Sequence, residues 1–244
     1  MKPEIRIFRD LNQFNQTAAE LFAERAAKAI QERGRFLVAL NGGSTPAGAF
    51  KLLGTEFQEK VDWSNVHVLW GDERCVPGDD PESSYGQARG LFLRHVPIPE
   101  TNVHRIKGEL PPAEAAQEYA MVLKELASPP LEWPRFDLVY LGMGEDGHTA
   151  SLFAGPDLQD ALDAPKARRA VGVMPDPMPE DAPVPRITLT RAAILSARTV
   201  LFTLTGSEKR ELLEQAIEDG QSSKLPVGRL LAEAEQPIDI HWAP

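Results

Sequence analysis

Short apolar runs that alternate with helix-like segments are the feature that most constrains how this chain can fold. The apolar runs lie at 5–8, 36–40, 66–70, 103–106, 136–141, 170–173, 186–190, 199–205 and 238–242. Segments with apolar residues at helical spacing lie at 12–33, 47–53, 83–95, 112–126, 191–197 and 210–218. Runs of this kind are typical of buried parallel strands, and their alternation with helices predicts an α/β fold. We therefore expect one domain over residues 1–244, with an open, mostly parallel sheet flanked by helices.

Charge and composition exclude several classes of protein. The chain has 244 residues and a formal net charge of −10, which argues against a general binder of nucleic acid or of anionic membranes. Its single cysteine, Cys75, cannot form an internal disulfide and fits a reducing compartment. No signal peptide or membrane-spanning apolar run is present, so we expect a cytoplasmic protein.

A histidine follows a glycine-rich turn after the apolar run at 136–141. Glycines stand at 142, 144 and 147, His148 comes next, and Thr149–Phe153 has the character of a helix start. Ligand sites of open α/β sheets lie at the carboxyl ends of the strands, so His148 is a candidate functional residue. The turn also fits the dinucleotide pattern G-x-G-x-x-G, but that match is weak because no βαβ unit with a ribose-binding acid follows.

A second strand end carries the features of a phosphate-binding loop. Asn41–Pro46 follows the run at 36–40, with Thr45 suited to an N-cap and Pro46 to the first helical position. The segment offers free backbone N–H groups, two hydroxyls and the positive end of a helix dipole, which together favour phosphate binding. The participating residues are Gly42, Gly43, Ser44 and Thr45.

Two further segments place charged groups at strand ends. Gly71–Pro77 carries Asp72 and Arg74 after the run at 66–70, although by itself it fits a solvated loop with a local ion pair. Lys209 falls in the first turn of the helix after Gly206, where a cation opposes the helix dipole and suits an anion contact. The acidic stretch 154–168 is expected on the surface, and the five prolines of 175–185 predict an ordered excursion or lid.

In their order and spacing these motifs resemble 6-phosphogluconolactonases, a family within the larger group that contains glucosamine-6-phosphate deaminase. The resemblance covers almost the whole chain and is strongest over Leu141–Phe153, followed by Gly71–Pro77. Gly42–Pro46 is shared with the deaminases, and Arg186–Thr190 matches the family's Arg-Ile-Thr-Leu-Thr. One departure is Ser84, where the family usually has Asn, which removes an amide that could hold the loop or touch the sugar.

The resemblance implies hydrolysis of 6-phospho-D-glucono-1,5-lactone to 6-phospho-D-gluconate in the pentose phosphate pathway. It implies a modified Rossmann-like fold, no metal and no cofactor, with a small-molecule sugar phosphate as the partner of a monomer or small homo-oligomer. His148 would be the general base, assisted by Asp72 and Arg74. The implied substrate-binding residues are Gly42, Gly43, Ser44, Thr45, Arg74, Gly144, Asp146, Arg186 and Lys209. The sequence leaves two questions open. One is whether Arg74, Arg186 or Lys209 holds the phosphate, and the other is whether Asp72 orients the sugar or His148.

Three other functions compete with this one. An amino-sugar phosphate isomerase or deaminase would use the same phosphate loop, but deaminases usually have Tyr where Arg74 stands and Asn-Glu-Pro near Ala150–Leu152. A non-catalytic sugar-phosphate sensor would usually be fused to a DNA-binding segment, and none is readable before Ile5 or after Trp242. A dinucleotide-dependent oxidoreductase rests on the weak glycine pattern alone.

Overall fold

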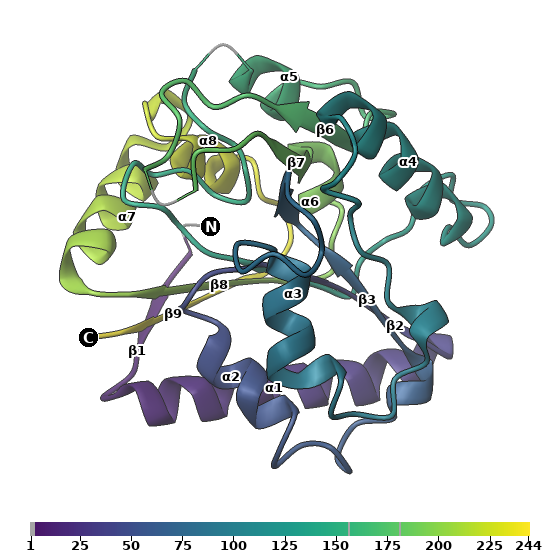
Figure 1. Cartoon of the computed structure of the whole chain (residues 1–244). Coiled ribbons are helices and arrows are strands. Elements are labelled where there is room, and N and C mark those ends of the chain that lie inside the picture. Colours follow the sequence, from purple (N-terminus) through teal and green to yellow (C-terminus); the bar gives the residue numbers. More distant parts are fainter. Residues whose placement is uncertain (1–2, 156, 181) are drawn as a thin grey trace.

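The computed structural model describes residues 3–155, 157–180 and 182–244 and is built around a six-stranded sheet (Figure 1). All neighbouring strands in this sheet are parallel, which confirms the expected fold class. In the order β1-β9-β8-β5-β2-β3 the strands are Ile5–Ile7, Ile238–Ala243, Val200–Thr205, Leu138–Leu141, Phe36–Leu40 and Val66–Trp70.

Helices cover both faces of this sheet. In Figure 1, α1 (Leu11–Arg33) and α2 (Ala47–Leu53) lie below it, whereas α7 (Ser207–Asp219) and α8 (Pro226–Ala232) lie above it. Helix α1 begins where the side chain of Asp10 accepts the N–H of Gln13 at 2.9 Å, and it ends at Gly34, whose φ of 75° only glycine adopts at little cost. The α8 helix was not expected from the sequence. None of the helices within the described ranges is long and apolar enough to cross a bilayer.

A second, three-stranded sheet stands beside the carboxyl ends of the large one and was also not expected. Its strands are β4 (Asp72–Arg74), β7 (Arg186–Leu189) and β6 (Ala170–Val173), paired antiparallel in that order. Gly71–Pro77, expected as a loop, therefore contributes a short strand, and the N–H of Leu189 donates to the carbonyl of Gly71 at 2.7 Å. Helices α4 (Pro112–Glu125), α5 (Leu158–Leu162) and α6 (Arg191–Ile194) surround this sheet in Figure 1.

Three local expectations were wrong. Thr149–Phe153 forms no helix, because Ala150 has a φ of 47° and the N–H of Ser151 donates to Thr188 of the second sheet at 3.2 Å. The run at 103–106 makes only a single bridge, from Val103 to Val68 of β3. The stretch 154–168 contains α5, which buries Leu162 in the core.

The remaining helical segments are short. Helix α3 (Ser84–Ala88) continues as a π-helical turn over Arg89–Leu93, and 3₁₀ turns occupy Trp63–Asn65, Glu100–Asn102 and Gly220–Ser222. Ser83 caps α3 by accepting the N–H of Gly86 at 3.0 Å. Helix α3 lies beside the loop after β2, where the N–H of Gly43 donates to Gln87 (Figure 1).

Candidate active site

The loops at the carboxyl ends of the parallel strands enclose a cavity of about 230 Å³. It lies where strand-end motifs from four separate parts of the sequence meet. Nine of its lining residues belong to those motifs as expected: Gly42, Gly43, Ser44, Thr45, Asp72, Arg74, Gly144, His148 and Lys209. Two expected site residues, Asp146 and Arg186, do not line it.

His148 is held in place by Asp146 and Phe153. Its Nδ1 lies 2.5 Å from Oδ1 of Asp146, and the same oxygen accepts the backbone N–H of His148 at 3.1 Å. The imidazole lies against the ring of Phe153, with 4.2 Å between centroids. Burial raises the pKa of Asp146, but the hydrogen bonds and charge of His148 outweigh it and hold that pKa below its usual value. Asp146 is therefore a carboxylate that orients the imidazole.

The glycines of the turn are required by the position of this imidazole. A Cβ on Gly144 would come within 2.2 Å of both Cε1 and Nδ1 of His148. Gly147 has a φ of 78°, and its carbonyl accepts the N–H of Val227 at 3.2 Å, so α8 supports the turn from behind. The N–H of Gly144 donates to the carbonyl of His148 at 3.0 Å.

Strand β4 separates the three charged residues of its motif. Side chains alternate across a strand, so Asp72 and Arg74 face the cavity while Glu73 points into the interior, where it is 1% exposed. Asp72 accepts the hydroxyl of Ser151 at 2.6 Å. Arg74 donates to the carbonyl of Glu82 at 2.7 Å. Both side chains that face the cavity are therefore positioned by neighbouring loops.

Glu73 organises the wall of the cavity from beneath. Its carboxylate accepts the N–H groups of Arg74, Ser84 and Tyr85 at 2.8, 2.7 and 2.9 Å and the hydroxyl of Ser83 at 3.0 Å. The start of α3 is thereby fixed to β4. The sequence analysis did not select Glu73; its place between two functional residues on a strand was the available signal.

The loop after β2 keeps donors available for an anion. Among the described residues, none accepts the backbone N–H of Ser44 or Thr45, whereas Gly43 donates to Oε1 of Gln87 at 3.0 Å. Thr45 is not the N-cap that the sequence suggested: Pro46 holds that position, in helical conformation and without a side-chain cap. The hydroxyl of Thr45 is therefore not committed to the helix.

Five further lining residues were not among the expected site residues, although Asn41, Gly142 and Ser84 lie in segments that the sequence analysis discussed. They are Asn41, Ser84, Gly142, Met143 and Ala150. Asn41 is the most informative, because it is 8% exposed and its Oδ1 has no hydrogen-bond partner among the described residues. A polar residue directly after a fully apolar strand was the signal for it.

Arg186 supports the site from outside the cavity. It is 3% exposed, and its guanidinium donates to the carbonyls of Ala182, at 2.8 Å, and Val184. It also lies 5.9 Å from the ring of Phe153, which contacts His148. Arg186 thus links the proline-rich segment to the residues behind the imidazole. Asp181 of that segment lies outside the described residues.

Within the described parts of the chain, no group of three or more His, Cys, Asp or Glu side chains is placed to hold a metal ion. The donors of the cavity are instead hydroxyls, amides and cations around one histidine. Such a set can bind a phosphorylated, hydroxylated ligand and accept a proton from water.

Residues 9–242 match the family described as glucosamine-6-phosphate isomerases/6-phosphogluconolactonase. The chain belongs to this family. It is 39% identical over 233 residues to a probable 6-phosphogluconolactonase 4, chloroplastic, of Oryza sativa, covering 92% of this chain and 70% of that protein. It is 36% identical to the 6-phosphogluconolactonase of Mycobacterium leprae, and the match covers 93% of this chain and 90% of that protein.

Solved structures of the family share the architecture. The 6-phosphogluconolactonase of Shewanella baltica superposes with a TM-score of 0.84 at 31% identity, over 99% of this chain and 98% of that one. The 6-phosphogluconolactonase of Trypanosoma cruzi superposes with a TM-score of 0.82 at 30% identity, over 99% of this chain and 94% of that one. A monomeric glucosamine-6-phosphate deaminase gives 0.78 at 20% identity over 98% and 97%, which shows a common fold alone.

Proposed function

We propose that this family member hydrolyses 6-phospho-D-glucono-1,5-lactone to 6-phospho-D-gluconate, the lactonase step of the oxidative pentose phosphate pathway. One observation carries the proposal: His148, oriented by Asp146, and the donor-rich loop Gly42–Thr45 line the same cavity. The substrate has a cyclic ester at one end and a phosphate at the other, so it needs a base and an anion site in one cavity. The named lactonases among the relatives support the same assignment.

His148 would act as the general base. With Nδ1 donating to Asp146, Nε2 is the nitrogen left to accept a proton from water. The water oxygen bonds to the lactone carbonyl carbon and forms a tetrahedral oxyanion. Its collapse restores the carbonyl and breaks the bond from that carbon to the ring oxygen. The ring oxygen then takes the proton from the imidazolium, which returns His148 to its starting form and opens the ring.

Side chains are the better candidates for stabilising the oxyanion. The N–H groups of Gly144, Gly147 and His148 already donate within the turn. Asn41 and Arg74 also line the cavity and can donate to the oxyanion. Asp72 would accept a sugar hydroxyl, because the hydroxyl of Ser151 holds it at the cavity wall.

The phosphate would lie against the loop after β2. Its oxygens would accept the N–H groups of Ser44 and Thr45, and Lys209 would add the cation from the first turn of α7. Arg186 is not proposed to touch the phosphate, because its guanidinium bonds to carbonyls of the 182–184 segment. It would act by positioning Phe153 behind His148.

A coupled assay tests this function. Glucose-6-phosphate dehydrogenase would generate fresh lactone, and its disappearance would be timed with and without the protein. We expect decay well above the spontaneous background, and decay at the background rate would reject the proposal. Release of ammonia from glucosamine 6-phosphate would instead identify a deaminase.

We also propose that residues 1–244 work as one domain, in the cytoplasm, as a monomer or small homo-oligomer without metal or cofactor. The acidic chain with one cysteine supports this setting. Light scattering would determine the oligomeric state. Dialysis against a chelator should leave the lactonase rate unchanged, and a loss restored by a divalent cation would count against the metal-free mechanism.

A further inference from the structure

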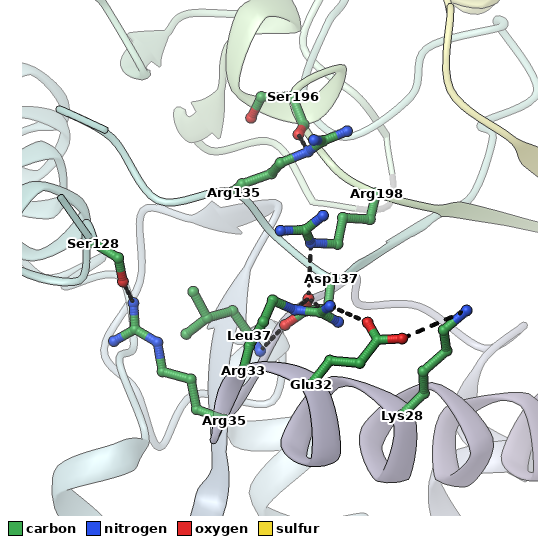
Figure 2. Close-up of polar contacts among 10 residues, drawn as sticks. All are labelled: Lys28, Glu32, Arg33, Arg35, Leu37, Ser128, Arg135, Asp137, Ser196 and Arg198. Carbon is green, nitrogen blue, oxygen red and sulfur yellow. Dashed lines mark hydrogen bonds and ion pairs between the residues drawn. The ribbon is translucent and has the colours of Figure 1, made fainter. Parts of the chain in front are cut away.

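Four arginines line a second cavity at the opposite edge of the large sheet. This cavity measures about 250 Å³ and lies where β2, β5 and β8 begin. Arg33 and Arg35 precede β2, Arg135 precedes β5, and Arg198 precedes β8 (Figure 2). Residues advance by about 3.3 Å along a strand, so the five residues of β2 separate this cavity from the catalytic one by roughly 16 Å.

Asp137 is the single acidic residue among the described residues that line the cavity, and one carboxylate cannot balance four arginines. It is 6% exposed and accepts the backbone N–H of Leu37 at 2.9 Å, which joins β5 to β2. Arg33 and Arg198 approach the same carboxylate oxygen at 3.0 and 3.3 Å. Four guanidinium groups and one carboxylate leave a formal charge of +3, in a chain whose net charge is −10.

Among the described residues, the hydrogen-bond acceptors of Arg35 and Arg135 are all neutral. Arg35 donates to Oγ of Ser128 at 2.8 Å, and Nε of Arg135 donates to the carbonyl of Ser196 at 3.1 Å (Figure 2). These bonds fix each guanidinium, yet among the described residues no carboxylate pairs with either one. Guanidinium groups fixed in this way and not paired are suited to bind phosphate oxygens.

A second acid, Glu32, pairs with Arg33 from outside the cavity. Glu32 pairs with Arg33 and, at 3.9 Å, with Lys28 of the same helix (Figure 2). It lines an adjoining cavity, which also contains Arg25. Glu32 is thus shared between Lys28 and Arg33, the one arginine that lines both cavities, and it makes no ion pair with Arg35 or Arg135.

We propose that this cavity binds a small phosphorylated metabolite, distinct from the substrate held at the catalytic edge. Its phosphate would lie between Arg35, Arg135 and Arg198, and the apolar side chains of Leu131 and Pro134 would cover the rest of the molecule. The volume supports a ligand of this size, because the catalytic cavity assigned to a hexose phosphate measures about 230 Å³.

Nuclear magnetic resonance with inorganic pyrophosphate as the probe tests this site separately from the catalytic one. Amide signals of Leu37 and Ser128 report on the arginine-lined cavity, whereas those of Ser44 and Thr45 report on the catalytic loop. We expect saturable shifts at Leu37 and Ser128 in the full-length protein. No saturable shift at these two amides would overturn the proposal, whatever happens at Ser44 and Thr45.

Variants establish that the arginines are responsible. The double variant Arg35→Gln/Arg135→Gln should bind pyrophosphate roughly tenfold or more weakly, as measured at the Leu37 amide. The affinity of the single variant Arg135→Gln should lie between those of the double variant and the wild type. Arg9→Gln is the matched control, because that side chain is 85% exposed and its one ion pair among the described residues is with the adjacent Asp10. The shifts at Ser44 and the lactonase rate should be the same in all of these proteins. Unaltered affinity in the double variant would overturn the proposal, as would equal affinity for citrate in place of pyrophosphate.

Discussion

Oδ1 of Asp146 lies 2.5 Å from Nδ1 of His148 and 3.1 Å from the backbone nitrogen of the same residue. One carboxylate oxygen therefore fixes both the ring and the chain that carries it. The arrangement spans only two residues, so the orientation of the imidazole is set locally by the turn. Phe153 on one side of the ring completes the support.

Asp146→Asn should lower kcat and leave KM nearly unchanged. The amide oxygen can still accept from Nδ1, but it no longer stabilises the charge that the imidazole gains when it takes a proton. The loss should be smaller than that of His148→Ala, because the ring itself remains. Steady-state kinetics in the coupled assay measure both parameters. A rise in KM with constant kcat would place Asp146 in substrate binding instead.

His148→Ala should lose about 10²–10⁴ of the catalytic rate, the usual range for general-base assistance. The phosphate loop is untouched, so calorimetry should detect 6-phosphogluconate binding with nearly wild-type affinity. His95→Ala is the matched control, because His95 is exposed and the hydrogen bond that its side chain makes among the described residues is with the neighbouring Arg94. An active His148→Ala protein with an unaltered pH profile would remove His148 from this role.

Gly144→Ala should impair catalysis more than folding. The new methyl group would meet the His148 ring at 2.2 Å, and the ring can move away only by leaving Asp146. We expect kcat to fall while the thermal midpoint changes little. Gly90→Ala is the control, since an added Cβ there meets no atom within 4 Å. Wild-type kcat in Gly144→Ala would show that the observed ring position is not required.

Glu73→Gln should destabilise the protein and loosen the wall that carries Arg74. The amide would turn an NH₂ group toward two of the four donors that the carboxylate now accepts, which costs about 1–3 kcal/mol in the free energy of unfolding. Urea denaturation measures this change. Glu82→Gln is the control: Glu82 is exposed, so this substitution should leave the free energy of unfolding unchanged. An equal effect of the two substitutions would contradict the role given to Glu73.

His241→Phe should reduce the loss of stability in acid. Burial, followed by the charge of Arg6, lowers the pKa of His241 to about 4, from 6.5 in the unfolded chain. Between these values the unfolded state binds more protons, so the free energy of unfolding falls as the pH is lowered from 6.5 towards 4. Phenylalanine does not titrate and can contact Phe8, whose ring centroid lies 4.9 Å from that of His241.

Urea denaturation at pH 7 and pH 5 measures this effect. The free energy of unfolding should differ less between pH 7 and pH 5 in His241→Phe than in the wild type. In the exposed control His95→Phe this difference should equal that of the wild type. Part of the difference will remain, because burial also lowers the pKa of His104 to about 4. A pH dependence equal to that of the wild type would exclude His241 as its source.

The large sheet could be predicted because its strands are marked locally. Phe36–Leu40 is buried along its whole length and is a continuous apolar run, and Val66–Trp70 is interrupted only by the half-buried His67. The edge at which their carboxyl ends meet follows from parallel pairing, and most of the expected site residues do line one cavity there.

The second sheet and the conformation of 149–153 could not be predicted from local pattern. Strands β4 and β7 are short and pair across more than a hundred residues of sequence, so nothing local marks the pairing. Thr149–Phe153 has a composition suited to a helix, but Ser151 instead bonds to Asp72 and Thr188. Such tertiary contacts override a weak local preference. For the same reason the sequence did not reveal that Arg186 lies behind Phe153.

The alternation along β4 restricts how this part of the gene can vary in length. Inserting or deleting one codon between Gly71 and Cys75 would turn each side chain of β4 to the other face of the strand. The carboxylate of Glu73 would then leave its four buried donors, and Asp72 or Arg74 would point into the interior. The turn at 79–82 lies outside this alternation, and what the site requires of it is that the carbonyl of Glu82 still accepts from Arg74. Across descendants of this chain, length changes should therefore accumulate in that turn, while the triplet Asp72, Glu73 and Arg74 keeps its spacing.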